Sequence, residues 1–129
     1  MKAILSRNLY WTLHAKNKMR YYGLSESRIK RVLKQPKRAE EGMAENTAAL
    51  MQPTSIKRKQ GQETWNQEIW VMIQIAPNGP TVPERSSRAK RDVSQEIKII
   101  SAWRYPGRAP ARNPIPPEII RELEKEGLL

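Results

Sequence analysis

The run of residues 69–75 (IWVMIQI) constrains the fold of this 129-residue chain more than any other feature. Its four aliphatic residues alternate with Trp70 and Met72, so an extended backbone would carry apolar side chains on both faces. A strand of this kind is usually covered on both faces, which predicts a position inside a sheet. A second apolar run, at 97–105, is the expected neighbouring strand. The loop between them, at 77–96, is rich in proline and charge, and we expect it to be mobile.

The composition excludes several kinds of site. The chain has no cysteine and one histidine, which rules out disulfides, thiolate chemistry and a His-rich or Cys-rich metal centre. We therefore expect neither a metal ion nor another cofactor. No apolar run approaches the roughly 18 residues of a membrane span, and the N-terminus lacks the apolar core of a signal peptide. The expectation is a cytoplasmic protein with one modest core and no membrane partner.

The positive charge is concentrated in the N-terminal part of the chain. The formal net charge is +11, and residues 1–38 hold eleven Lys and Arg against one acid, Glu26. A basic region of this density indicates a polyanionic partner, most often nucleic acid, because each cation near a phosphate releases condensed counterions. The alternatives are a solvated surface that keeps the protein soluble and a face that an acidic protein covers.

Two consecutive helices are predicted near the N-terminus. The first, at 9–22, ends at Gly23, which readily takes left-handed backbone angles. Its buried stripe would consist of Trp11, Ala15, Met19 and Tyr22. The second helix, at 26–34, begins after the N-cap residue Ser25 and ends before Pro36. Its buried side would consist of Ile29, Val32 and Leu33.

The remaining elements complete an α+β domain. Residues 2–6 predict a short first strand, and 44–52 fit either a strand or a helix. The run at 57–62 predicts a turn before the central strand, and 118–126 predicts a last helix capped by Gly127. The two N-terminal helices would then pack on an antiparallel sheet. We expect this domain to span residues 1–106, followed at 107–129 by a basic proline-rich segment and the terminal helix.

Two segments resemble a known family. Residues 14–36 (HAKNKMRYYGLSESRIKRVLKQP) resemble the opening of a widespread family of small domains related to BrnT-like and RelE/ParE-like toxins. Its pattern is a histidine, a helix, a Gly–apolar–Ser/Thr link, a second helix and a proline. Residues 98–108 (KIISAWRYPGR) resemble the last strand of BrnT-like toxins, with Trp103 at a position where those toxins carry arginine. The two segments cover about a quarter of the chain, in the same order as in the family.

The resemblance implies both a fold and an activity. The fold would be RelE-like, with two N-terminal helices against a twisted antiparallel sheet. The activity would be that of a metal-independent endoribonuclease toxin, which cleaves RNA by attack of the 2′-hydroxyl group. Its partners would be RNA rather than DNA, a cognate antitoxin that covers the basic face and, for some members, the ribosome. The ParE branch of the superfamily acts on gyrase instead.

Cleavage of RNA without a metal needs a base, an acid and cations around the phosphate. His14 is the only side chain with an ordinary pKa near neutrality, so it is the candidate base or acid. Lys98 and Arg104 are the candidate catalytic cations, and their spacing of six would place them on one face of a regular strand. The alternative for His14 is a partly buried helix residue, and for the two cations it is charges at strand ends that reach water.

Further cations complete the predicted RNA site. Lys18 lies close to the middle of the buried stripe of the first helix, while Arg38 and Arg108 would form a phosphate-binding rim. The alternative for both arginines is an ordinary solvated position. The large aromatic residues are expected in the core, although an exposed Trp65 would stack on a base. These core aromatics are Trp65, Trp70, Trp103 and Tyr105.

Three functions therefore remain open from the sequence. The first is the ribonuclease toxin, with the basic helices and the last strand forming the RNA cleft. The second is a non-catalytic module that binds RNA, DNA, a ribosome surface or an acidic protein through the same face. The third is a protein-directed inhibitor in the manner of the ParE branch, because a fold does not determine a function.

Overall fold

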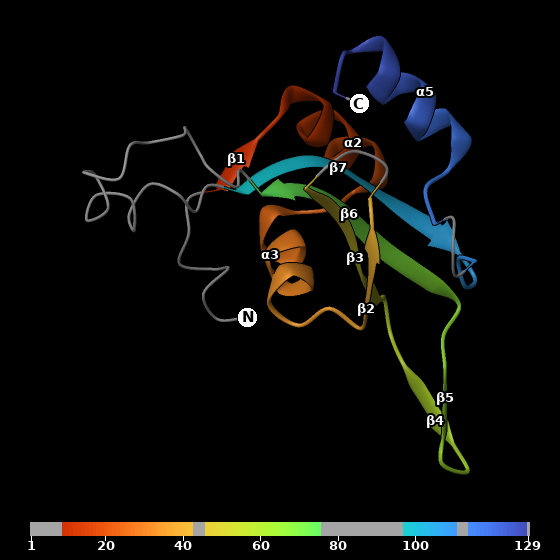
Figure 1. Cartoon of the computed structure of the whole chain (residues 1–129). Coiled ribbons are helices and arrows are strands. Elements are labelled where there is room, and N and C mark those ends of the chain that lie inside the picture. The colour runs from red at the N-terminus through yellow and green to blue at the C-terminus, as the bar shows by residue number, and fades with distance from the viewer. Residues whose placement is uncertain (1–8, 43–45, 76–96, 111–113, 129) are drawn as a thin grey trace.

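Five strands form the central sheet, in the order β1-β7-β6-β3-β2 (Figure 1). The computed structural model describes residues 9–42, 46–75, 97–110 and 114–128. The predicted strand at 2–6 and the predicted loop at 77–96 lie outside these ranges. The strands are β1 (Leu9–Trp11), β2 (Arg38–Glu41), β3 (Thr47–Pro53), β6 (Gln67–Ile75) and β7 (Ile97–Pro106). All neighbours are antiparallel except β1, which pairs parallel to β7.

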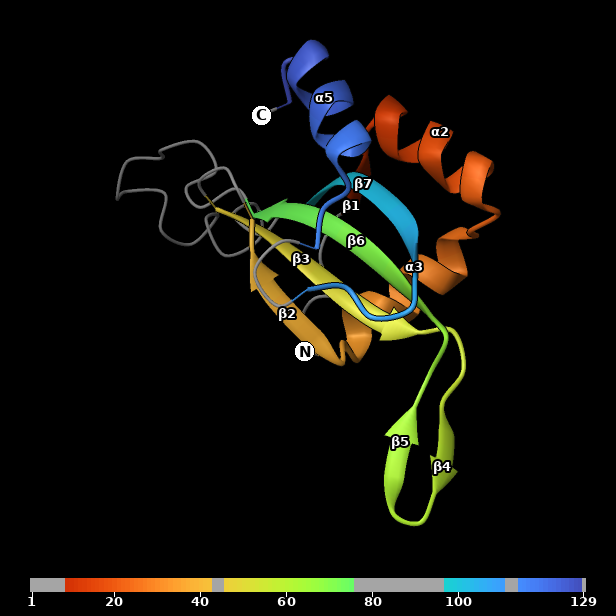
Figure 2. The ribbon, with the colours of Figure 1, turned by 90° about the vertical axis from the view of Figure 1, so that its right-hand side faces the viewer.

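The central position predicted for the apolar run is confirmed. β6 lies between β7 and β3 and is covered on both faces. Helices α2 (Leu13–Tyr22) and α3 (Glu26–Lys34) cover one face, which we call the α3 side. Helix α5 (Pro117–Lys125), together with Ala109 and Ile115, covers the other, which we call the α5 side (Figure 2). The α+β class is therefore confirmed, with a sheet that is mostly rather than wholly antiparallel.

A β-bulge divides β7 into two halves. Met72 of β6 pairs with Ser101, whereas the next residue, Ile73, pairs with Ile99, so Ile100 has no partner across the ladder. Ile99 packs in the apolar cluster on the α3 side, and Ile100 packs in the cluster on the α5 side. An extra residue of this kind reverses the alternation of side chains beyond it.

The bulge separates two predicted catalytic cations. Lys98 precedes it and alternates with two isoleucines of the α3 side, so it belongs to the α5 side. Arg104 follows it and alternates with Trp103, which packs on the α5 side, so Arg104 belongs to the α3 side. The prediction that the two cations share a face is therefore wrong, because it assumed a regular strand.

The first helix starts later than the sequence indicated. Residues 9–11 form β1, and Thr12 caps α2 by accepting a hydrogen bond from Ala15 N at 3.0 Å. The Thr12 hydroxyl group also donates to Ile99 O at 2.9 Å, which fixes the helix to β7. Trp11 is therefore a strand residue, contrary to the prediction that it lies on the helix. The Ser25 cap of α3 and the left-handed Gly23 between the two helices are confirmed.

A small hairpin extends from the end of the sheet (Figure 2). Its strands β4 (Lys57–Lys59) and β5 (Gln62–Thr64) are joined by Gln60 and Gly61, both at positive φ. This is the two-residue turn that the twist of a hairpin favours. The predicted turn at 57–62 is thus present but narrower, at 60–61, and the two strands that flank it were not predicted. The segment at 44–52 that fitted a strand or a helix contains most of β3.

Candidate functional site

His14 lies in the first turn of α2, and its side chain, which is only 3% exposed, faces α5. Its Nε2 atom is 2.9 Å from the hydroxyl oxygen of Ser101, and its Nδ1 atom is 3.4 Å from a carboxylate oxygen of Glu126. Glu122 is also near, with an oxygen 3.9 Å from Nε2. The imidazole is therefore held between a buried hydroxyl group of the last strand and the acidic side of α5.

A cleft of about 380 Å³ opens over this histidine. Lys18 lies at its edge and donates from Nζ to Glu122 Oε2 at 3.1 Å, with an ion-pair distance of 2.9 Å to Oε1. The cleft is lined by His14, Asn17, Lys18, Tyr21, Glu122 and Glu126. All of them except Asn17 are able to exchange a proton, which is what an acid–base reaction requires. The structure brings His14 and Lys18 together as predicted, but it adds the two glutamates, which the sequence did not indicate.

Arg104 is occupied by contacts to the link between α2 and α3. Its guanidinium group donates to Tyr22 O at 2.7 Å, to Gly23 O at 3.4 Å and to the side-chain oxygen of Gln67 at 2.9 Å. These bonds satisfy carbonyl groups at the end of α2, which would otherwise lack a partner. None of the described contacts joins Arg104 to His14 or to Lys98.

Arg38 connects β2 to the segment that follows β7. It donates to Ala109 O at 2.9 Å and to Pro110 O at 3.1 Å, and it pairs with Glu40 at 2.9 Å. Its guanidinium carbon lies 5.0 Å from the centre of the Trp70 ring. These contacts hold the chain against the sheet, so Arg38 does not form part of the His14 cleft.

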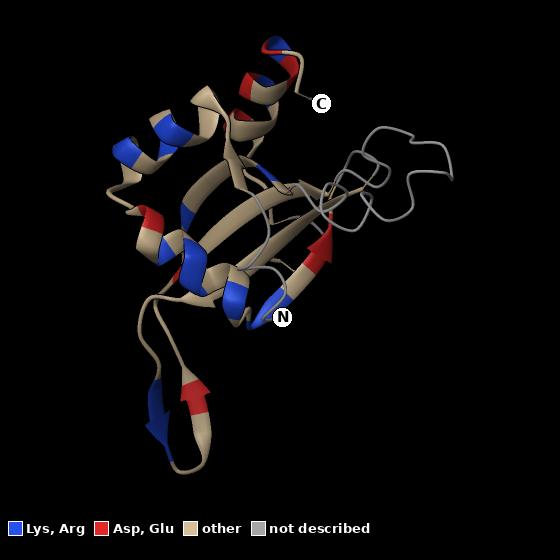
Figure 3. Ribbon diagram, turned by 90° about the vertical axis from the view of Figure 1, so that its left-hand side faces the viewer, with Lys and Arg blue, Asp and Glu red and all other residues tan. Residues whose placement is uncertain are grey.

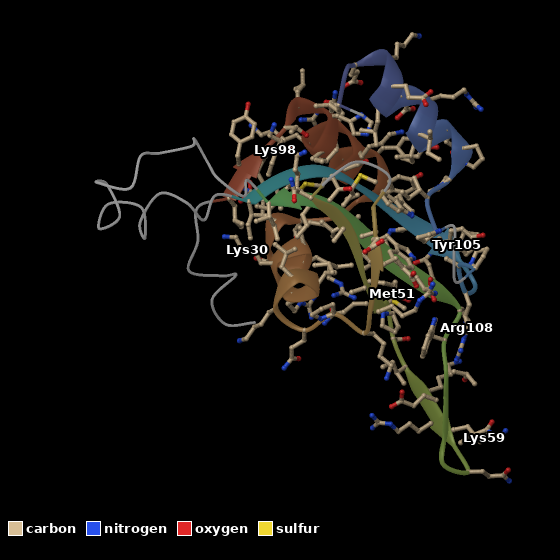
Figure 4. All side chains as sticks on the ribbon, viewed as in Figure 1. Lys30, Met51, Lys59, Lys98, Tyr105 and Arg108 are labelled. Atoms are coloured by element: carbon tan, nitrogen blue, oxygen red, sulfur yellow. The ribbon has the colours of Figure 1, made fainter. Side chains whose placement is uncertain are left out.

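Arg108 lies at the opposite end of the sheet from Lys98 (Figure 4). Its guanidinium carbon is 4.0 Å from the centre of the Trp65 ring, and it donates to Glu63 O at 3.1 Å. Lys37 approaches the same ring at 5.8 Å. Trp65 is therefore within cation–π distance of two cations at the base of the hairpin.

Glu68 has a role that the sequence did not indicate. It stands in the polar start of β6, after Asn66 and Gln67, yet its side chain is completely buried. Its carboxylate accepts hydrogen bonds from the indole nitrogens of Trp65 at 2.8 Å and Trp70 at 2.9 Å, and from Ala109 N at 3.0 Å. The available signal was an acid between two tryptophans, since a buried carboxylate needs several donors.

Helix α3 presents a basic surface on the outside of the sheet (Figure 3). Lys30, Arg31 and Lys34 are exposed, and Arg28 is half-buried beside them. Within the part of the chain that the structure describes, no carboxylate lies at ion-pair distance from these four cations. Burial, together with the neighbouring charges of Arg31 and Arg104, lowers the pKa of Arg28 below its ordinary value. The surface therefore carries a positive potential that its own described side chains do not neutralise.

The hairpin extends this basic surface. Lys57 and Lys59 are exposed, and the two of them alternate with Arg58, which pairs with Glu63 at 2.9 Å. Glu63 also accepts from Lys37, and these two hydrogen bonds hold the pKa of its carboxyl group below the ordinary value. We use the term basic face for the six cations of α3 and the hairpin that lack a described carboxylate partner; unpaired cations on other elements, such as Arg121 and Lys125 of α5, are not part of it. The six are Arg28, Lys30, Arg31, Lys34, Lys57 and Lys59.

Comparison with protein-family models, with curated protein sequences and with solved structures gives no match, so the site is interpreted from its own geometry. Among the described side chains, no group of three or more His, Asp or Glu is arranged to hold a metal ion. Each described helix is too short or too polar to cross a membrane.

Proposed function

We propose that this protein binds single-stranded RNA through the basic face. The observation that carries the proposal is the placement of six cations on α3 and the hairpin without a described carboxylate partner. The ion pairs of His14 and Lys18, in contrast, lie between α2 and α5. Unpaired cations on one surface attract a phosphate backbone, because binding releases its counterions. The resemblance of residues 14–36 to RNA-directed toxins favours RNA over DNA.

The arrangement of the predicted catalytic residues also favours a binding module. His14 is buried beneath α5, Arg104 holds the link between α2 and α3, and Lys98 and Arg104 belong to opposite sides of the sheet. A metal-free ribonuclease needs its base and its cations around one phosphate. The three side chains would have to rearrange to meet that condition.

Fluorescence anisotropy with a single-stranded RNA tests this proposal. The double variant K30Q/K34Q removes two charges from α3, and the matched control R121Q/K125Q removes two from exposed positions of α5. We expect about tenfold weaker binding for the first and less than twofold for the second. The reason is that binding weakens mainly when the removed cation contacts a phosphate. Equal losses in the two variants, or no binding by the wild type at low salt, would contradict the proposal. Binding of an acidic protein but not RNA would assign the face to a protein partner.

A second candidate is the metal-independent endoribonuclease toxin. The cleft over His14 supports it, because an imidazole, an ammonium, a phenol and two carboxylates meet there. Induced expression with mapping of new RNA 5′ ends tests it, using H14A against the exposed control K16A. The ribonuclease proposal expects growth arrest and new ends for the wild type and the control, and neither for H14A. Intact RNA in cells that accumulate folded wild-type protein would exclude it.

A further inference from the structure

A hollow of about 400 Å³ lies between α3 and the connection from β3 to β4. This volume is within the range of small-molecule sites in proteins. Its lining combines basic and apolar side chains, including Arg28, Arg31, Lys37, Pro53 and Ile56. The hollow joins the α3 part of the basic face to the base of the hairpin.

Arg28 is fixed in position at this hollow. Its guanidinium group donates to the side-chain oxygen of Gln52 and to Pro53 O at 3.1 Å. The amide of Gln52 is itself oriented, since its nitrogen donates to Gln35 O at 2.9 Å. A guanidinium group has five N–H donors, so Arg28 keeps three for another partner. A cation oriented by a second layer of hydrogen bonds is typical of a binding site.

The positions of the two arginines at the hollow destabilise the protein when no ligand is bound. Arg31 is exposed, three residues after Arg28 and on the same side of the helix, where like charges repel. Arg28 also lies in the first turn of α3, where the helix dipole disfavours a cation. The helix dipole favours a cation in the last turn, which accounts for the position of Arg31 but not for that of Arg28. An anion bound between the two guanidinium groups would relieve both costs.

The apolar lining indicates what accompanies the anion. Pro53 lies at the inner side of the hollow and is buried, while Ile56 is 39% exposed. A simple inorganic anion would leave Ile56 in water, whereas a sugar or base attached to a phosphate would cover it. A pair of arginines also suits the planar, bidentate recognition of phosphate oxygens.

We propose that this hollow binds the phosphate group of one nucleotide unit of an RNA strand, between Arg28 and Arg31, with the attached sugar and base against Pro53 and Ile56. The inference rests on the proposed RNA-binding function and identifies its principal contact. The phosphate is either an interior diester or the monoester at a strand end. A terminal monoester carries the larger charge and would bind the two arginines more strongly.

Titration with adenosine 5′-monophosphate, followed by NMR, tests the site directly. We expect the side-chain Nε–H signal of Arg28 and the side-chain amide signals of Gln52 to shift together and to saturate. Inorganic phosphate should shift the Arg28 signal with a weaker affinity, because it makes no contact with Ile56. Shifts that map elsewhere and leave Arg28 and Gln52 unchanged would overturn the assignment.

Binding of RNA oligonucleotides identifies the source of the phosphate. R31Q removes an exposed charge that makes no described hydrogen bond, so the variant should fold normally, and R121Q on α5 is the matched control. We expect R31Q to weaken binding about five- to tenfold and R121Q less than twofold. A terminal phosphate predicts tighter binding of a 5′-phosphorylated strand than of a 5′-hydroxyl strand, with the difference lost in R31Q. An interior phosphate predicts equal binding of the two strands and an equal loss for both in R31Q.

Different results of the RNA-binding experiment would overturn this inference and the proposed function. If the wild type binds RNA while R31Q and the conservative variant R28K bind as well as R121Q, the hollow is not the phosphate site, although the protein still binds RNA. If the wild type binds no RNA at low salt, the proposed function is overturned and the inference with it.

Discussion

At the scale of single residues, Glu68 determines how the chain returns to the sheet after β7. Its carboxylate joins two tryptophans to the backbone of Ala109, and Arg38 lies 3.9 Å away. A buried carboxylate is stable only where donors replace its lost hydration. Glu68 therefore links β6, the base of the hairpin and the segment that leads to α5.

We predict that E68Q destabilises the protein by about 3 kcal/mol, the order expected when one partner of a buried charged network is removed. The amide keeps the shape but has one accepting oxygen in place of two, and it presents N–H groups to the indole donors. Urea denaturation followed by tryptophan fluorescence measures the change. The control is E124Q on the exposed side of α5, which should stay within about 0.5 kcal/mol of the wild type. A similar small effect for E68Q would contradict this role.

Residue roles were predictable where they depended on local pattern. Trp70 and Trp103 are completely buried, as their positions in apolar strands predicted. Thr12 carried an N-cap signal that would have placed the start of α2 correctly, but its bonds to β7 join residues 87 and 88 positions apart. His14 likewise meets Glu126 across 112 positions. Such partners depend on how helices pack, which periodicity along the chain does not specify.

At the scale of elements, long periodic segments were predicted and short edge strands were not. β6, β7, α3 and α5 each have an apolar pattern that continues through the element. β1 has three residues, and β2 has the sequence RAEE, so neither contains enough positions to show a period. The pattern also did not show the bulge in β7, because Ile99 and Ile100 are both apolar and the small residues Ser101 and Ala102 fit either face.

Helix α5 should dock through its apolar side. Leu123 is completely buried in the cluster that contains Trp103. We predict that L123A destabilises the docked helix by about 3 kcal/mol, because the smaller side chain loses contacts and leaves a cavity. The same change at Leu13, which is 72% exposed on α2, is the control and should have little effect. Chemical denaturation of both variants measures the difference, and equal effects would show that α5 is not held by this contact.

The stability of the hairpin should depend on pH through the carboxyl group of Glu63. Hydrogen bonds from Lys37 and Arg58 lower the pKa of this carboxyl group, so the folded protein favours its charged form. The contribution to stability is complete above the unfolded pKa of about 4.3 and is lost as the pH falls through the lower folded value. Carbon-13 NMR of the Glu63 carboxyl group measures that pKa directly. We expect K37Q to raise it toward the ordinary value, with K16Q on α2 leaving it unchanged; an ordinary pKa in the wild type would contradict the pairing.

At the scale of the whole molecule, the described cations lie in different environments. Lys18 between α2 and α5 pairs with Glu122, whereas the six cations of the basic face have no described carboxylate partner. The attraction between RNA and the total charge acts over long distances, and physiological salt screens it beyond about 8 Å. Local contacts with phosphates instead appear in the salt dependence of affinity. The two effects are therefore separable by experiment.

We predict that RNA affinity falls about 130-fold between 50 and 200 mM salt, which corresponds to about five phosphates, one of them at Arg28 and Arg31, at a slope of roughly 0.7 per phosphate for a single strand. K57Q/K59Q on the hairpin and K30Q/K34Q on α3 should each reduce the slope by about 1.4, because each removes two contacts. R121Q/K125Q removes the same formal charge from α5 and should keep the wild-type slope. Anisotropy titrations at four salt concentrations measure the slopes of the wild type and the three variants. A reduced slope in the α5 variant as well would mean that RNA responds to total charge, and the basic face would then have no special role.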